Sequence, residues 1–219
     1  MKAMILAAGY GRRLAPLTDE TPKPLLPIDG KPLILHQLVR LKEAGIQDVV
    51  INLHHLGHLI EACLGDGSTL GLNIQYSREA QLLDTGGGIK KALTMLGDAP
   101  FVLCNGDILC DLDFRDLSVP QGEDLCHLLL APKPDYRATG DFLFKNGRIV
   151  ARGDDYIYCG ISVLDPKLFA QSPEAPFSLA DLLFRAAAEG KLSGQAFFGH
   201  WTDIGTPDEY ARVRGTPAS

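Results

Sequence analysis

The sequence predicts a single Rossmann-like α/β domain with a mixed, mostly parallel sheet, helices on both faces and a small β insertion. Short apolar segments typical of buried strands alternate with amphipathic segments typical of helices through the first half of the chain. The length of 219 residues and the 46% hydrophobic content suit one domain with its own core. In the second half, Asn146-Gly147 is a strong signal for a tight hairpin, which indicates the insertion.

The first half predicts strands and helices in strict alternation. A buried strand at residues 3–7 leads into a loop rich in glycine and arginine. The elements expected after that loop are a helix at 32–44 that stops at Gly45, a strand at 48–52, a helix at 56–64, a strand at 73–77, a helix at 88–96 and a strand at 101–104. This order predicts parallel strands joined by crossover helices.

The second half predicts shorter strands and two further helices. The expected elements are strands at 125–131, 142–145, 149–152, 156–164 and 195–201, a helix at 178–188 with Ser178 as its N-cap, and a helix at 207–214. Residues 215–219 are expected to be a frayed tail.

Composition argues against several classes of protein. The formal net charge of −6 does not suit a nucleic-acid surface, which is normally basic. The five cysteines form no CxxC pair, so neither a zinc ribbon nor a disulfide framework is indicated. No apolar run approaches the roughly 20 residues of a membrane span, and the N-terminus does not read as a secretory signal. We therefore expect a cytoplasmic protein without nucleic-acid or membrane partners.

The most informative segment is Ala7-Ala8-Gly9-Tyr10-Gly11-Arg12-Arg13-Leu14, followed by Pro22-Lys23-Pro24. Small residues after a strand let backbone N–H groups approach an anion, and Arg13 and Lys23 add positive charge. The dinucleotide fingerprint fits poorly, because Leu14 stands where its third glycine should be and Asn52 where its acidic residue should be. A Walker A ending is absent. A phosphate-binding loop and a plain turn both stay open at this point.

With Leu17-Thr18 and Leu25, this segment resembles the signature of the sugar-1-phosphate nucleotidyltransferases. Further matching blocks are Asp84-Thr85-Gly86-Gly87-Gly88-Ile89, Asn105-Gly106-Asp107, Gly140-Asp141-Phe142, residues 160–164 and residues 200–206. Over the whole chain, the sequence is similar to the short bacterial members that act on N-acetylmuramate 1-phosphate. The resemblance implies transfer of a nucleotidyl group from a nucleoside triphosphate to a sugar 1-phosphate, with pyrophosphate leaving.

The resemblance also implies a role for each motif. Arg13 would hold the β- and γ-phosphates, and Lys23 would neutralise the α-phosphate and the attacking phosphate. Asp107 and Asp203 would hold Mg²⁺; each follows an apolar segment, so both could lie at one sheet edge, although taken alone each could equally be a cap or turn residue. The implied nucleotide-binding residues are Ala7, Ala8, Gly9, Gly11, Leu83, Gly87, Gly88 and Asn105. The implied sugar-phosphate-binding residues are Gly140, Asp141 and Gly160.

The resemblance further implies one nucleotidyltransferase domain at 1–214, with a nucleotide-binding half at 1–107 and a sugar-phosphate-binding half at 108–214. The Glu-Lys-Pro segment with which some relatives hold the acceptor phosphate is absent, and the nearest stretch is Arg152-Gly153-Asp154-Asp155. Either Arg137 or Arg152 could bind a carboxylate on the acceptor sugar. The pair His54 and His58 has the spacing of two metal ligands on a helix, but two solvated histidines explain it as well.

The leading hypothesis is transfer from UTP to N-acetylmuramic acid α-1-phosphate, in cell-wall recycling. A GTP-dependent mannose- or heptose-1-phosphate guanylyltransferase is the main alternative. A phosphocholine cytidylyltransferase would need an aromatic cage, which one tryptophan and 7% aromatic residues disfavour. An inactive regulatory homologue would have lost Arg13, Lys23, Asp107 or Asp203, and all four are present. Since no hexapeptide-repeat extension follows the domain, we expect a monomer.

Overall fold

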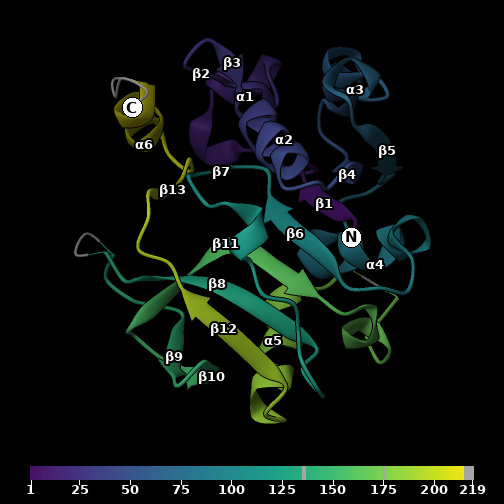
Figure 1. Ribbon diagram of the computed structural model, residues 1–219. Helices are drawn as coiled ribbons and strands as arrows, with labels where there is room; N and C mark the ends of the chain where they lie inside the picture. The colour runs from purple at the N-terminus through teal and green to yellow at the C-terminus, as the bar shows by residue number, and fades with distance from the viewer. Residues whose placement is uncertain (135–136, 175, 215–219) are drawn as a thin grey trace.

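The computed structural model describes residues 1–134, 137–174 and 176–214. A nine-stranded sheet with the order β5-β4-β1-β6-β11-β8-β12-β10-β9 runs through the molecule (Figure 1). Its strands are β1 (Ala3–Leu6), β4 (Asp48–Leu53), β5 (Asn73–Arg78), β6 (Phe101–Asn105), β8 (Cys126–Pro132), β9 (Phe142–Lys145), β10 (Arg148–Arg152), β11 (Tyr156–Leu164) and β12 (Leu192–Ala196). Relative to β1, strands β10 and β11 run in the opposite direction, and the other strands of this sheet run the same way. The expected mixed, mostly parallel sheet is confirmed.

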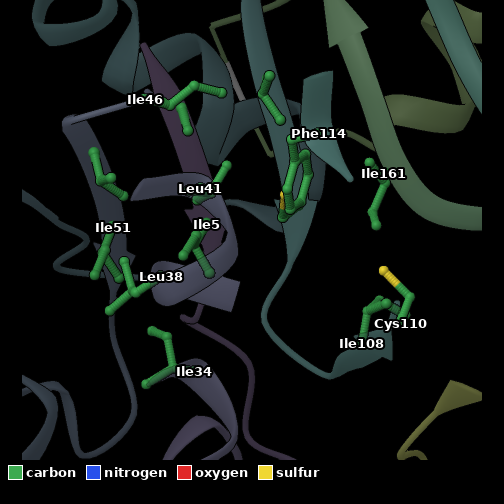
Figure 2. Close-up of a cluster of buried hydrophobic side chains, with 14 of the residues drawn as sticks. Ile5, Ile34, Leu38, Leu41, Ile46, Ile51, Ile108, Cys110, Phe114 and Ile161 are labelled. Atoms are coloured by element: carbon green, nitrogen blue, oxygen red, sulfur yellow. The ribbon is translucent and has the colours of Figure 1, made fainter. Parts of the chain in front are cut away.

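Helices cover both faces of the sheet, as expected. On one face, α2 (Leu33–Glu43) and α3 (Gly57–Leu64) pack over the parallel strands, with Ile34, Leu38 and Leu41 of α2 close to Ile5 of β1 (Figure 2). On the other face, α4 (Asp84–Leu96) and α5 (Leu179–Ala188) share a core with Met4. Ile5 and Met4 are consecutive in β1, and their opposite directions follow from the two-residue repeat of a strand.

A third apolar cluster joins the two ends of the chain. Helix α6 (Pro207–Arg214) packs Tyr210 and Val213 against Leu26 and Ile28, next to the short strands β2 (Pro27–Ile28) and β3 (Lys31–Pro32) and the helix α1 (Leu17–Glu20) (Figure 1). Helix α6 therefore packs against the segment that follows β1 and stabilises it. The expected frayed tail, 215–219, lies outside the described residues.

The small β insertion is the hairpin of β9 and β10. Asn146 has φ 50° and Gly147 has φ 78°, the left-handed pair that a two-residue type I′ turn requires. These angles confirm the expected hairpin at its turn. Asparagine and glycine reach this left-handed conformation at the lowest cost, which explains why they stand there.

One strand expected near the C-terminus is wrong. Residues 195–201 do not form a single strand: β12 ends at Ala196, and Trp201–Asp203 forms β13, which pairs antiparallel with β7 (Ile108–Cys110) in a separate two-stranded sheet. Asp203 consequently ends this ribbon and not a strand of the main sheet. No sequence signal predicted β7, whose three residues carry too short a pattern to be distinguished from a loop.

The helix expected at 88–96 begins four residues earlier. Gly86, Gly87 and Gly88 lie buried inside the first turns of α4 and do not precede the helix. The N–H groups of Gly86 and Gly87 both donate to the carbonyl oxygen of Phe177, at 2.9 Å and 3.2 Å, so a distant segment satisfies the free donors of the helix start. A Cβ on Gly86 would clash with the Phe177 ring, which explains the glycine there. In the described part of the chain, no helix combines the length and apolar character that crossing a membrane would need.

Candidate active site

A cavity of about 270 Å³ opens at the carboxyl ends of β1, β4 and β6. It is lined by Leu6, Ala7, Ala8, Gly9, Lys23, Pro24, Asn52, Leu82, Asp84, Thr85, Asn105, Gly106 and Asp107. Open α/β sheets bind ligands at this edge, since the loops that leave the parallel strands meet there. Five of the residues expected to bind the nucleotide or act on it line this cavity together: Ala7, Ala8, Gly9, Lys23 and Asn105.

The two glycines of the loop after β1 have different reasons to be glycine. A Cβ on Gly9 would meet no atom within 4 Å, so protein packing does not demand glycine, and the space beside it belongs to the cavity. Gly11 has φ 65°, and a Cβ there would lie 2.9 Å from Cγ2 of Thr18. The Thr18 hydroxyl donates to the Gly11 carbonyl oxygen at 3.0 Å. Gly11 therefore shapes the turn, while Gly9 leaves room for a ligand to approach the backbone.

Lys23 reaches the cavity from a single 3₁₀ turn at Lys23–Leu25, between Pro22 and Pro24. Its Nζ donates to Oδ2 of Asp107 at 2.6 Å, and the two side chains are 12% and 30% exposed. The other oxygen, Oδ1 of Asp107, is buried and finds no hydrogen-bond partner among the residues that the structure describes. A buried carboxylate oxygen without a partner is costly unless something occupies it.

The pairing of β7 with β13 brings the backbone of Asp203 next to that of Asp107. The N–H of Ile204 donates to the carbonyl oxygen of Asp107 at 2.9 Å, and Asp203 pairs with Ile108 in the ribbon. Oδ2 of Asp203 accepts from Arg137 at 3.1 Å. The structure thus brings the two predicted metal ligands together, each with a cation against it.

The chemistry of the Asp107 and Asp203 carboxylates suits a magnesium ion, and the ion itself stays a prediction. Both offer the hard oxygen ligands that Mg²⁺ prefers, and the unpartnered Oδ1 of Asp107 is a free ligand atom at the cavity. Among the described residues, no set of three His, Cys, Asp or Glu side chains could hold a metal. Two carboxylates suit Mg²⁺ in particular, because this ion keeps waters and takes further oxygens from phosphates. The same finding leaves His54 and His58 without the third described ligand that a zinc site would need.

Arg13 is not among the described residues that line the cavity. The Arg13 side chain is exposed. A Cβ on Gly205, two residues after Asp203, would come within 3.1 Å of the Arg13 guanidinium. The guanidinium therefore lies near the segment that carries Asp203. Its expected contact with the outer phosphates stays a prediction.

Of the three residues expected to bind the sugar phosphate, Gly160 is the nearest to the cavity. It has φ 72° at an irregularity of β11, and a Cβ there would lie 2.8 Å from Nδ2 of Asn105. Gly140 donates its N–H to Oδ1 of Asp154 at 2.5 Å, and the Asp141 carboxylate accepts from the N–H of Tyr158 at 2.9 Å. These two hydrogen bonds hold the segment between Arg137 and β9 in place. The contact of Gly140 and Asp141 with a sugar stays a prediction.

Leu83, Gly87 and Gly88 lie next to the cavity and not among its described lining residues. The Leu83 N–H donates to Glu79 and the Gly87 N–H to Phe177. A Cβ on Gly88 would press on Glu79 and Asn52. The neighbouring Leu82, Asp84 and Thr85 line the cavity, and the contact of Leu83, Gly87 and Gly88 with a nucleotide stays a prediction.

Three polar residues that support the site were missed by the sequence reasoning. Gln37 of α2 donates to the carbonyl oxygens of Asn105 and Ile108, at 2.7 Å and 2.8 Å, and so holds the turn that presents Asp107. Asn52 and Glu79 are buried beside the loop after β1. The available signal was a polar side chain at an apolar position: Gln37 lies within the apolar stripe of its helix, and Asn52 lies within an otherwise apolar run of β4.

Thiol chemistry has no support at the site. Burial raises the pKa of the Cys104 and Cys159 thiols, which lie in strands β6 and β11 behind the cavity. Both cysteines therefore stay neutral near pH 7 and act as small apolar residues of the core.

Comparisons with known proteins agree with this geometry. A family model described as nucleotidyl transferase matches residues 2–140. The chain is 44% identical over 217 residues to the N-acetylmuramate alpha-1-phosphate uridylyltransferase of Neisseria meningitidis serogroup B, covering 94% of each chain. It is 32% identical over 229 residues to the mannose-1-phosphate guanylyltransferase catalytic subunit beta of Dictyostelium discoideum, covering 98% of this chain and 64% of that one.

The fold has close counterparts among solved structures. A Bacillus anthracis protein assigned as a glucose-1-phosphate thymidylyltransferase superposes with a TM-score of 0.86 at 25% identity, over 100% of this chain and 97% of that one. Because the family model covers more than half of the chain, and the Neisseria protein aligns with nearly all of it, this chain belongs to the nucleotidyl transferase family, as its resemblance to the sugar-1-phosphate nucleotidyltransferases implied.

Proposed function

We propose that the protein transfers the uridylyl group of UTP to N-acetylmuramic acid α-1-phosphate, in cell-wall recycling. The observation that carries the reaction class is the cavity under the glycine loop, with the Lys23–Asp107 pair at one end. An oxygen of the acceptor phosphate forms the new bond to the α-phosphorus, the bond to the bridging oxygen breaks, and pyrophosphate leaves. The 44% identity to the Neisseria uridylyltransferase supports the choice of substrates, against 32% to the guanylyltransferase subunit.

The charges of the site meet the main demand of this reaction, which is to bring two anionic phosphates together. Lys23 is fixed between two prolines and points its ammonium into the cavity, where an α-phosphate can replace Asp107 as its partner. Asp107 and Asp203 would hold Mg²⁺, which when bound neutralises charge on the phosphate oxygens. Arg13, which does not line the cavity, would hold the leaving pyrophosphate. No protein nucleophile is required.

The two ends of the cavity suggest how the nucleotide lies. Lys23 and Asp107 would mark the phosphate end, and we infer that Leu82 and Thr85, which also line the cavity, contact the base and ribose at the other end. Its volume of about 270 Å³ is at the lower limit of ligand pockets, which span roughly 300–1,000 Å³. We infer that the acceptor sugar binds outside it, on the side of Asp203 and Arg137. We also propose that the protein is cytoplasmic, monomeric and active on small molecules. Sedimentation as a dimer at micromolar concentration would contradict the proposed monomer.

We expect UTP with N-acetylmuramic acid α-1-phosphate to be the preferred substrate pair. The measurement is pyrophosphate release, compared as kcat/KM over four nucleoside triphosphates and several sugar 1-phosphates, with GTP and mannose or heptose 1-phosphate as the competing pairs. A preference of about tenfold, or 1.4 kcal/mol, is within what one base-specific hydrogen bond provides. The same preference for a GTP pair would show that the substrate assignment is wrong.

We expect Arg137→Ala to raise the KM of the acceptor about tenfold or more, since a charged hydrogen bond contributes this much, and to leave the KM of UTP unchanged. Arg137 is 32% exposed and lies against Asp203, facing the proposed acceptor side. Arg152, the other candidate from the sequence, stacks its guanidinium 3.7 Å over the ring of Phe184 in α5 and serves as the matched control.

A second sugar tells which acceptor group Arg137 binds. A loss with N-acetylmuramic acid 1-phosphate and not with N-acetylglucosamine 1-phosphate, which lacks the lactyl group, assigns Arg137 to the lactyl carboxylate. An equal loss with both assigns it to the phosphate. An unchanged acceptor KM in Arg137→Ala, or an equal rise in Arg152→Ala, would contradict the assignment.

A further inference from the structure

A chain of three hydrogen bonds, two buried and one partly buried, connects residues on two sides of the cavity. The N–H of Ala7 donates to Oδ1 of Asn52 at 2.8 Å, Nδ2 of Asn52 donates to Oε1 of Glu79 at 2.7 Å, and the N–H of Leu83 donates to Oε2 of Glu79 at 3.0 Å. Asn52 and Glu79 are only 3% and 5% exposed. The chain therefore runs from the end of β1, across the ends of β4 and β5, to the start of α4.

The direction of these bonds requires a carboxylate at position 79. Both ends of the chain are backbone N–H groups, which only donate. The amide of Asn52 accepts on one side and donates on the other, so Glu79 must accept from both Asn52 and Leu83. A glutamine at 79 would set its Nε2 against one of these donors. Turning the Asn52 amide over would only move the conflict to Ala7.

Gly88 leaves the space that the side chains of Asn52 and Glu79 need. A Cβ at this position of α4 would lie 2.7 Å from Oε1 of Glu79 and 2.9 Å from Nδ2 of Asn52. Glycine in a helix interior costs roughly 1 kcal/mol relative to alanine, so a packing reason is expected for it. A second contact ties the same elements: Nδ1 of His54 donates to the carbonyl oxygen of Glu79 at 2.9 Å, and its Nε2 accepts from the hydroxyl of Tyr10 at 3.1 Å.

We propose that Asn52 and Glu79 are positioning residues for the nucleotide. They set the distance between the glycine loop at Ala7–Gly9 and the segment from Leu82 to Thr85, and hence between the phosphate end and the base end of the cavity. Neither side chain has to touch the nucleotide for this role. The proposal rests on the proposed function in one respect, that this cavity binds the nucleoside triphosphate.

Two single variants and their combination test the proposal. In Glu79→Gln two donors face each other, and in Asn52→Asp two carboxylates do. When both substitutions are combined, every bond is restored with the opposite arrangement. The new carboxylate at position 52 accepts from the N–H of Ala7 and from the glutamine amide at position 79, whose oxygen accepts from Leu83. We expect each single variant to weaken UTP binding and raise its KM about tenfold or more. The double variant should return to within about threefold of the wild type.

The readouts are the Kd of UTP by calorimetry and the KM of both substrates. The KM of N-acetylmuramic acid 1-phosphate is expected to stay within about twofold in all three variants, which a general loss of folding would not allow. Asp124→Asn is the matched control, because Asp124 is a nearly buried carboxylate that accepts from Arg148 at 2.7 Å, beyond the cavity. It should lower thermal stability and leave the Kd of UTP unchanged. Gly88→Ala, which crowds the pair, should weaken UTP binding as the single variants do.

Contrary outcomes separate this proposal from the proposed function. Single variants that bind UTP normally, or a double variant that is unfolded or as weak as Glu79→Gln, overturn the positioning role alone. A double variant that folds and still binds UTP as weakly as Glu79→Gln would assign Glu79 to direct contact with the nucleotide. A wild-type protein that binds neither UTP nor GTP overturns both proposals. Normal UTP binding together with turnover of a different sugar phosphate overturns only the choice of acceptor.

Discussion

Asp107→Asn and Asp203→Asn are each expected to lose about 100-fold or more of kcat while the circular dichroism spectrum stays that of the wild type. Losing even a group that supports a metal ligand typically costs 10- to 100-fold, and here the ligand itself loses its charge. An asparagine also leaves Lys23 or Arg137 without its carboxylate partner. The measurements are turnover at millimolar Mg²⁺ and the affinity for Mn²⁺, a spectroscopic substitute, in the absence of substrate.

Asp111→Asn is the matched control for this pair. Asp111 follows β7 in the same ribbon region, is exposed, and accepts from the N–H of His200 at 2.8 Å. It should keep nearly full activity and Mn²⁺ affinity. Full activity in either Asp107→Asn or Asp203→Asn would refute the metal assignment for that residue, and a loss of activity with unchanged Mn²⁺ affinity would assign it to another step.

Lys23→Ala is expected to cut kcat/KM by about 100-fold or more, because a charge fixed against a transferring group typically contributes about 2.7–4 kcal/mol. The expected cost in stability is much smaller. Both Lys23 and Asp107 keep some solvent contact, at 12% and 30% exposure, so losing their ion pair should cost about 1–2 kcal/mol. For a protein of this length that lowers Tm by less than about 8 °C. Lys23→Met, which keeps the aliphatic part of the side chain, should lose the same activity with a smaller change in Tm.

Lys90→Met is the control for the Lys23 variants, because it removes a half-buried lysine outside the cavity. Lys90 of α4 is 22% exposed and donates to Glu174 at 2.7 Å and to the carbonyl oxygen of Ser172 at 2.8 Å. It should lower Tm and leave kcat/KM unchanged. The opposite pattern in Lys23→Ala, a collapsed fold with specific activity near normal, would make Lys23 a structural residue.

The sequence by itself determined the elements whose signals are local. The apolar runs predicted β4, β6 and β11, and their short length and flanking turns set them apart from helices. The apolar spacing within residues 32–44 predicted helix α2, and Leu38 and Leu41 lie on its buried face. Asn146-Gly147 predicted the turn of the β insertion, because its backbone angles depend on those two residues alone. The glycine loop and Lys23 were predicted in the same way, from a motif contiguous in the chain.

Only the tertiary structure decided the elements that depend on a distant partner. β13 forms where it does because β7, about 90 residues earlier in the chain, offers its edge, and this pairing brings Asp203 beside Asp107. The helix α4 extends through three glycines, against their propensity, because the carbonyl oxygen of Phe177 accepts from the N–H groups of its first turn. The bonds from Ala7 through Asn52 and Glu79 to Leu83 link three separate segments of the chain. The physical reason is common to all three: a hydrogen bond fixes geometry only when both partners are in place, and a sequence shows each partner without the other.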